Sequence, residues 1–160
     1  MVTGNTNTVV QIETTMNALI KINCYQIMKQ TSSKKYGYTK STSLAFTDAI
    51  VKMREELGKE GFGVLTEIDV SATLKKKLDI DYGNYLILGA CNPQFAYEAL
   101  KAEKEIGLFL PCNTIVYEEE GKTFVSAILP TVAMSVIDNP ALAEIAKKVE
   151  EKLKRVIDNV

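Results

Sequence analysis

The chain has 160 residues, of which 46% are hydrophobic and 24% are charged, the composition of an ordinary globular protein. It contains no histidine, which excludes serine–histidine and cysteine–histidine catalytic pairs and any histidine-ligated metal site. The formal net charge of −1 gives no electrostatic reason to expect a nucleic-acid partner.

The cysteine count indicates the compartment. Three cysteines are an odd number in a chain that is long enough to fold without disulfides. This usage is typical of a reducing environment, so we expect a cytoplasmic protein. No stretch approaches the roughly 18 consecutive apolar residues of a membrane-spanning helix, and the first residues lack the pattern of a secretory signal. We therefore expect no membrane partner.

The first 34 residues differ from the rest. Residues 1–42 hold five lysines and one glutamate, a net charge of +4, whereas the remainder holds 14 basic and 19 acidic residues, a net charge of −5. The apolar residues before position 35 repeat with neither helical nor strand periodicity. We predict an N-terminal extension over 1–34, poorly ordered or weakly helical around 13–22, and a single domain over 35–160. Cys24 lies in the extension and is assigned no role.

The first half of the domain is predicted to contain a strand, a helix, a strand and a short helix. A strand over 36–39 is followed by hydroxyl residues that can cap a long helix. That helix is predicted from an apolar stripe with three- and four-residue spacing, which consists of Phe46, Ile50, Met53 and Leu57. Alternating residues predict a strand over 61–69, with a bulge or close contact at its glycines. Ser71 can cap a short helix in which Leu74 and Leu78 face the core.

The second half is predicted to contain three strands and two helices. Tyr85–Cys91 is apolar throughout, which favours a central strand covered on both faces. Asn92 is a suitable helix cap, and Pro93 is a suitable first helical residue. Glycine in the short connection at 119–122 is typical of a β-hairpin. These signals place strands over 85–91, 113–118 and 123–129 and helices over 93–106 and 140–158.

Together these elements predict an α+β fold. We expect a mixed, mostly antiparallel sheet of about five strands with helices on one face, in a β-α-β4-α type core. The other face would be exposed unless a partner covers it. Because the strand over 85–91 is apolar on both sides, we expect a homodimer.

Four short motifs resemble those of one known family, in the same order. They are residues 61–69 (GFGVLTEID), 88–93 (LGACNP), 110–113 (LPCN) and 138–140 (DNP). The chain from Tyr36 to Val156 is similar to the family called domain of unknown function 302, whose members are bacterial and archaeal. The resemblance implies a compact α+β domain and members that often pair as dimers. It implies no activity, because none is established for the family.

Two Cys-Asn pairs bracket the helix over 93–106. Cys91-Asn92 precedes it and Cys112-Asn113 follows it, so the thiols would meet at the sheet edge if their strands are neighbours. The helix start beside Cys91 would favour its thiolate, which allows a redox-active or ligand-binding pair. The ordinary alternative is that both cysteines are small buried hydrophobic residues and that the asparagines serve capping and a bend.

Glu67 is the remaining candidate, because it lies in an otherwise apolar strand. A half-buried carboxylate there could act as a general acid or base, whereas Asp69 on the same side favours plain solvent exposure. The spacing of the cysteines and acids predicts no metal site, and no common nucleotide-binding motif is present. The cofactor, if any, is left open.

The favoured hypothesis is a dimeric binding module that holds a small ligand near Cys91, Asn92, Cys112, Asn113 and Glu67. One alternative is an enzyme that uses a thiol or a carboxylate at the same site, for example in redox chemistry. Another is a purely structural dimer. The absence of histidine favours binding over catalysis.

Overall fold

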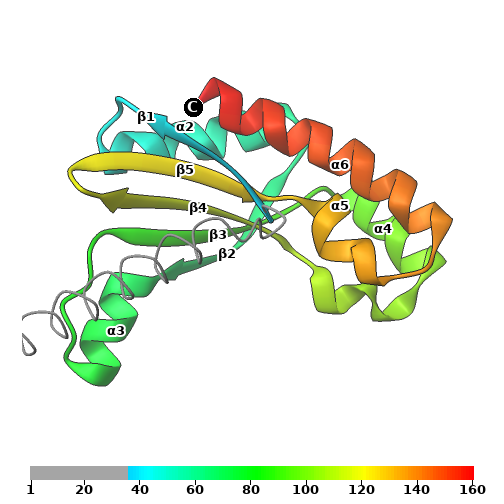
Figure 1. Cartoon of the computed structure of the whole chain (residues 1–160), viewed down its shortest axis with the longest axis horizontal. Coiled ribbons are helices and arrows are strands. Elements are labelled where there is room, and N and C mark those ends of the chain that lie inside the picture. Colours follow the sequence, from blue (N-terminus) through cyan, green and yellow to red (C-terminus); the bar gives the residue numbers. More distant parts are fainter. Residues whose placement is uncertain (1–35) are drawn as a thin grey trace, which may run out of the picture. The chain divides into compact units, whose positions relative to one another are not determined.

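The computed structural model describes residues 36–160 (Figure 1). The predicted N-terminal extension, its short helix at 13–22 and Cys24 lie outside the described residues. All statements below concern the described part of the chain.

A five-stranded sheet is the centre of the structure, and every neighbouring pair of its strands is antiparallel. The strand order is β1-β5-β4-β3-β2, so β3 and β5 flank the central β4. The predicted α+β class and the number of strands are confirmed. The strands are β1 (Gly37–Thr42), β2 (Gly63–Asp69), β3 (Tyr85–Cys91), β4 (Cys112–Glu119) and β5 (Lys122–Ile128).

Helices connect these strands. The α-helices are α2 (Phe46–Lys59), α3 (Val70–Leu78), α4 (Pro93–Ala102), α5 (Pro130–Ala133) and α6 (Pro140–Asn159). Two short 3₁₀ helices, η1 (Lys104–Phe109) and η2 (Met134–Val136), follow α4 and α5. The structure contains no helix within 36–160 that is long and apolar enough to cross a membrane.

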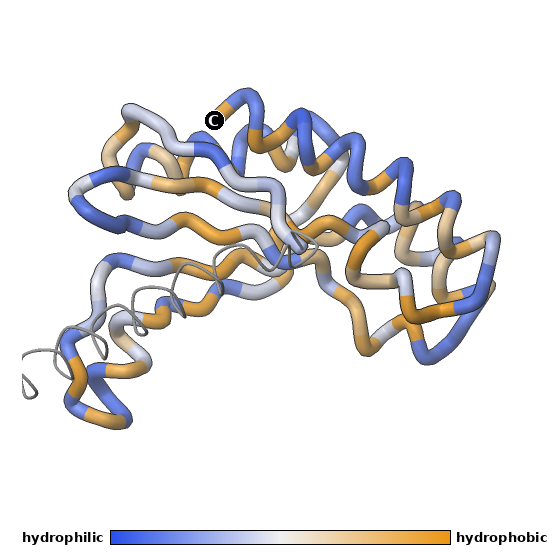
Figure 2. Tube along the Cα trace, viewed as in Figure 1, coloured by the Kyte–Doolittle hydropathy of each residue, from blue (hydrophilic) through white to orange (hydrophobic). Residues whose placement is uncertain are grey.

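The core lies between one face of the sheet and the two long helices α2 and α6 (Figure 1). Alternate side chains of β3 and β4 enter this layer, as the two-residue period of a strand requires. Figure 2 shows the resulting hydrophobic residues along the central strands and along α6. The most deeply buried side chains of this core are Met53, Leu57, Leu88, Val116, Val125, Leu153, Val156 and Ile157.

Several element boundaries and one helix cap differ from the prediction. The first strand extends to Thr42, and α2 begins after Ala45 without a side-chain cap. Asp69, not Ser71, caps α3 by accepting a hydrogen bond from the Ala72 N–H. The predicted helix over 93–106 divides into α4 and η1.

The expectation that α3 packs its leucines into the core is wrong for Leu78. No residue of α3 is buried, and Leu78 is 62% exposed. The helix contacts the ends of β2 and β3 but stays clear of the core formed by α2 and α6 (Figure 1).

A β-bulge interrupts β2. The register with β3 shifts between Val64 and Thr66, which leaves Leu65 without a partner and 66% exposed. Thr66 then lies opposite Gly89, and a Cβ at Gly89 would collide with the Thr66 side chain and lie 2.7 Å from Pro111 Cγ. Glycine is therefore needed at position 89 by close packing across three segments.

Glu60 joins three helices at one point. Its carboxylate accepts hydrogen bonds from Arg155 Nε at 2.8 Å, from Arg155 Nη2 at 2.9 Å and from Lys152 Nζ at 3.1 Å. Its backbone carbonyl accepts from Lys152 Nζ at 3.1 Å and from Asn92 Nδ2 at 3.4 Å. The end of α2 is thereby fixed to α6 and to the start of α4. The hydrogen bonds from Arg155, followed by those from Lys152, lower the pKa of Glu60 to about 2.

The first prediction concerns the Glu60→Gln substitution. The carboxylate has a lower pKa in the folded chain than in the unfolded chain, so it stabilises the fold above pH ~4.5 and loses that effect as the pH falls toward 2. We expect Glu60→Gln to lower the free energy of unfolding by about 1–3 kcal/mol at pH 7. The difference from the wild type should shrink at pH 3. Urea denaturation at both pH values measures it.

The matched control is Glu144→Gln, which neutralises an exposed carboxylate on α6, the helix that carries Lys152 and Arg155. It should change the free energy of unfolding by less than about 0.5 kcal/mol. If Glu60→Gln lowered the free energy of unfolding equally at pH 7 and pH 3, the negative charge of Glu60 would not be the cause of the loss.

Candidate functional site

The two Cys-Asn pairs lie side by side at one end of the sheet. Cys91 ends β3 and Cys112 begins β4, and the antiparallel register places Cys112 opposite Ala90. The two cysteines are therefore one position out of register on adjacent strands. As expected, the fold brings the pairs together from both ends of the intervening helix.

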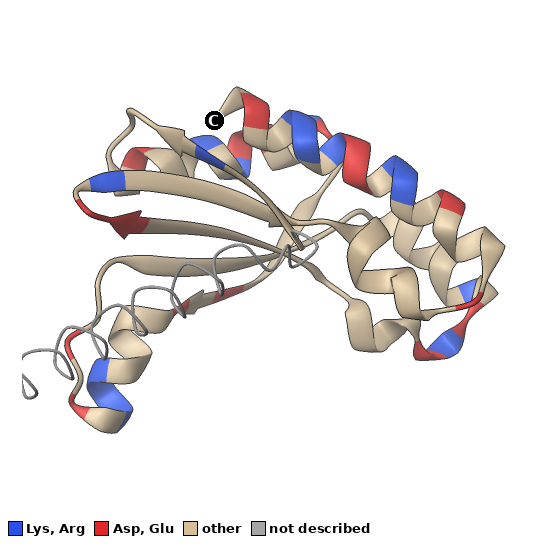
Figure 3. Cartoon of the chain, in the orientation of Figure 1, with Lys and Arg blue, Asp and Glu red and all other residues tan. Residues whose placement is uncertain are grey.

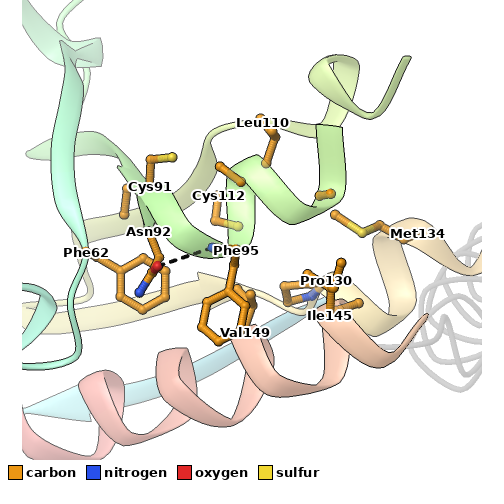
Figure 4. Close-up of a pocket in the computed structure, with 14 residues that line it drawn as sticks. Phe62, Cys91, Asn92, Phe95, Leu110, Cys112, Pro130, Met134, Ile145 and Val149 are labelled. Carbon is orange, nitrogen blue, oxygen red and sulfur yellow. Dashed lines mark hydrogen bonds between the residues drawn. The ribbon is translucent and has the colours of Figure 1, made fainter. Parts of the chain in front are cut away.

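The two thiols nevertheless lie on opposite faces of the sheet. Cys112 shares its face with Val116 and belongs to the core under α6, where it is 7% exposed. Cys91 is one residue beyond Ala90 and points toward the other face, because successive strand residues alternate. In Figure 4 the Cys112 sulfur points toward Phe95, whereas the Cys91 sulfur points away from it. Both cysteines nevertheless line one small apolar cavity, together with Asn92.

Burial disfavours ionisation of both thiols. It raises the pKa of Cys112 to about 11, and it also raises the pKa of Cys91. Both side chains are thus neutral thiols at pH 7. The thiolate that was considered for Cys91 from the neighbouring helix start is not favoured, because desolvation opposes the negative charge.

A small apolar cavity adjoins Cys112 (Figure 4). Its volume of about 30 Å³ has room for about two water-sized molecules. A ligand of ordinary size does not fit into it without movement of the core. The cavity lies among residues of α4, α6, α5 and the sheet, notably Phe62, Phe95, Leu110, Met134, Ile145 and Val149.

Asn92 serves the fold. Its Oδ1 accepts hydrogen bonds from the Gln94 and Phe95 N–H groups at the start of α4, at 3.2 and 3.4 Å. Its Nδ2 donates to the Glu60 carbonyl. Both ends of the Asn92 amide are therefore hydrogen-bonded.

Asn113, by contrast, is exposed and lies opposite Gly89 on the face that α2 and α6 leave open.

Glu67 lies apart from the cysteines. It is opposite Leu88 in the register and therefore points to the helix side of the sheet, where it forms an ion pair with Arg54 of α2. The Glu67 side chain is 47% exposed. The pairing and the exposure agree with a carboxylate at the protein surface, not with a buried acid or base.

A second group of side chains lies on the face of the sheet opposite α2 and α6, which we call the open face. Three neighbouring strands place a row of aromatic rings there, with Tyr85 and Tyr117 stacked at 5.6 Å and Tyr117 and Phe124 stacked at 5.2 Å between ring centroids. Aliphatic side chains continue the row toward Asn113. The apolar residues of the open face are Ile68, Tyr85, Ile87, Ile115, Tyr117, Phe124 and Ile128.

The open face is hollowed beside these residues. The hollow has a volume of about 270 Å³ and contains Asn113 and Ser126 among mostly apolar side chains. The Ser126 hydroxyl is within 2.7 Å of the Thr39 hydroxyl, whereas the Asn113 amide is exposed. The other lining residues are Tyr36, Gly37, Tyr85, Ile87, Ile115, Ala127 and Ile128.

Sequence reasoning predicted an uncovered apolar face but missed this hollow. The available signal was the strand 85–91, in which Tyr85 and Ile87 alternate with Leu86 and Leu88. That pattern indicates two apolar faces. It does not show which residues of β4 and β5 align with Ile87, because the register depends on pairing between distant segments.

Comparison with known proteins identifies the class of domain. A crystal structure of an uncharacterised conserved DUF302 protein from Bacillus stearothermophilus is similar, with a TM-score of 0.75 and 36% sequence identity over 78% of this chain and 98% of that chain. The family described as domain of unknown function DUF302 matches residues 38–160. The chain therefore belongs to this family, as its motifs predicted. No curated protein matches the chain.

The second prediction concerns the reactivity of the thiols. A pKa raised from 9.0 to about 11 lowers the thiolate fraction of Cys112 at pH 7 by about 100-fold. We expect iodoacetamide to alkylate Cys112 in the native protein at least about 100-fold more slowly than in the urea-unfolded chain. Peptide mass spectrometry assigns the rate to each cysteine, and the unfolded chain is the control. Equal rates in both states would contradict the neutral, buried thiol.

Proposed function

We propose that this domain is a dimeric binding module whose open face binds a second copy and holds a small ligand. The observation that carries the proposal is the row of aromatic and aliphatic side chains on a sheet face that α2 and α6 do not cover. Contiguous apolar surface of this kind marks interaction sites in soluble proteins. Aromatic residues in particular are enriched in the centres of interfaces.

A homodimer would cover the open face with the same surface of a second copy. A symmetric interface uses the same surface on both copies, so an apolar row on one copy meets an identical row on the other. Burial of a fully apolar side chain stabilises an association by about 1.5–3 kcal/mol. Several such side chains on each copy supply enough favourable free energy to oppose the loss of rotational and translational freedom.

The hollow supplies the ligand site of the proposal. Its apolar walls and the single exposed amide of Asn113 suit a small molecule with an apolar body and one polar group. Of the five residues of the ligand hypothesis, Asn113 is the one that lines this hollow. A second copy over the open face would close it from solvent.

The raised thiol pKa values favour binding over the alternative of a thiol-dependent enzyme, since catalysis by cysteine requires a thiolate. Glu67 is exposed and ion-paired with Arg54, which likewise does not favour a carboxylate-dependent reaction at that residue. A purely structural dimer differs from our proposal only in lacking a ligand. The third prediction tests the dimer that both share, and the fourth prediction, on ligand binding, separates them.

The third prediction is that Ile87→Asp converts the dimer into a monomer. Ile87 lies opposite Ile115 at the centre of the open face, and a carboxylate there would have to be desolvated on association. We expect the dissociation constant to increase at least about 100-fold. Light scattering coupled to size-exclusion chromatography measures the mass, and circular dichroism verifies the fold.

The control is Val51→Asp, which places the same charge at a 57% exposed apolar residue on the outer side of α2. This variant should retain the mass of the wild type. A monomeric wild-type protein at 100 μM, roughly the concentration at which weak interfaces associate, would reject the dimer.

The fourth prediction tests the ligand site with 2-naphthol as the probe. Its rings fit apolar walls, and its hydroxyl can hydrogen-bond to Asn113, whereas naphthalene lacks the hydroxyl. We expect 2-naphthol to bind saturably and about 2- to 10-fold more tightly than naphthalene, the difference of one neutral hydrogen bond. Asn113→Leu should abolish the preference.

Titration followed by naphthol fluorescence provides the dissociation constants. The control variant is Asn84→Leu. Asn84 is exposed, immediately precedes β3 and donates a hydrogen bond to the Glu118 carboxylate outside the hollow. The variant should retain the preference for 2-naphthol. Non-saturable binding, or a preference that survives Asn113→Leu, would leave the structural dimer as the better account.

A further inference from the structure

Within residues 36–160, helix α3 makes few packing contacts. It is nine residues long, and none of its residues is buried. Isolated helices shorter than about 12 residues are marginally stable in water, so most helices depend on tertiary packing of an apolar face. The apolar side chains at its end and in the following segment are nevertheless exposed, namely Leu78 at 62%, Ile80 at 48% and Tyr82 at 52%.

Local polar contacts position α3 without burying its apolar surface. Asp69 caps its first turn, and the Ser71 hydroxyl donates to the Gly83 carbonyl at 2.6 Å. Lys75 forms ion pairs with Asp79 at 2.9 Å and with Asp81 at 3.0 Å. The helix therefore has a defined orientation and an uncovered apolar surface, the combination expected of a docking element.

The position of α3 relates it to the open face. Tyr85 is opposite Tyr117 in the register, so the segment that follows α3 lies at the same end of the sheet as the β4–β5 turn. The Glu118 N–H donates to the Asn84 carbonyl at 3.0 Å, which joins the two. Figure 1 shows α3 on the side of the sheet away from α2 and α6. The helix thus borders the open face.

Charges of opposite sign lie at this end of the sheet (Figure 3). Lys76 and Lys77 are exposed on α3, and within residues 36–160 neither forms a salt bridge. The turn between β4 and β5 carries Glu119 and Glu120, which are exposed and likewise form no salt bridge in this part of the chain. One copy therefore presents a basic element and an acidic element on the border of the same face.

The area of the open face alone is small for a stable dimer. Five strands about 4.8 Å apart, with a length of about 20 Å, give a face of roughly 500 Å² in projection. Specific interfaces bury about 800 Å² on each partner. Additional surface from outside the sheet is needed, and α3 is apolar, ordered and adjacent.

We propose that α3 and the segment 79–82 form an arm that grips a second copy of this chain. The two-fold axis is parallel to the strands, which places α3 of each copy beside the β4–β5 turn of the other. Lys76 and Lys77 then face Glu119 and Glu120 across the interface, and Leu78 and its neighbours become buried. An axis perpendicular to the strands would place α3 at the opposite end of the second copy, away from the acidic turn.

This arm rests on the proposed homodimer and specifies its geometry. The fifth prediction tests it by charge reversal in the full chain. Lys76→Glu/Lys77→Glu should increase the dimer dissociation constant at least about tenfold at low salt, because like charges then face each other. Glu119→Lys/Glu120→Lys should have a similar effect. Combining the four substitutions restores opposite charges and should return the constant to within about threefold of the wild type.

Sedimentation equilibrium at low and at high salt measures these constants, since salt screens the charge effect. The matched control is Lys147→Glu/Lys148→Glu, the same charge change on the exposed side of α6, which should leave the constant unchanged. A wild-type dimer that is insensitive to both reversals, or one that the combined variant does not restore, overturns the arm but leaves the dimer. A monomeric wild type overturns both.

Discussion

The structure depends on one constraint: within residues 36–160, a sheet with two apolar faces has two long helices, α2 and α6, and both cover the same face. Helices α2 and α6 bury the Leu88 and Val116 side of the sheet and build the core there. Because strand side chains alternate, the residues between them form a second apolar layer on the open face. The same two-residue period that stabilises the domain thus creates a second apolar surface, and both proposals rest on it.

This constraint also explains the roles of the two Cys-Asn pairs. They lie together because β3 and β4 are neighbours, yet the alternation separates Cys112 in the core from Cys91 toward the open face. Asn92 and Glu60 connect α4, α2 and α6 into one structural junction. Of the residues first considered for a site, Asn113 is the one that lies exposed in a hollow of useful size.

Local patterns predicted most elements correctly, including the apolar stripe of α2, the cap at Asn92 and the hairpin turn with Gly121. They failed where distant segments decide the outcome. Leu78 has helical spacing from Leu74 and was expected in the core, but no element covers α3 within residues 36–160. For Glu67 the sequence left a half-buried acid and a solvent-exposed residue as alternatives, and it could not identify the partner Arg54, which comes from α2.

The sequence by itself determined the α+β class, the family and the two apolar faces of the strand over 85–91, because periodicity and short motifs are properties of neighbouring residues. Only the tertiary structure decided which side chains share a face. The β2 bulge, the β3–β4 register and the placement of α3 arise from contacts between segments far apart in the chain. Those contacts divide the two thiols between opposite faces and align Tyr85, Tyr117 and Phe124 in one aromatic row.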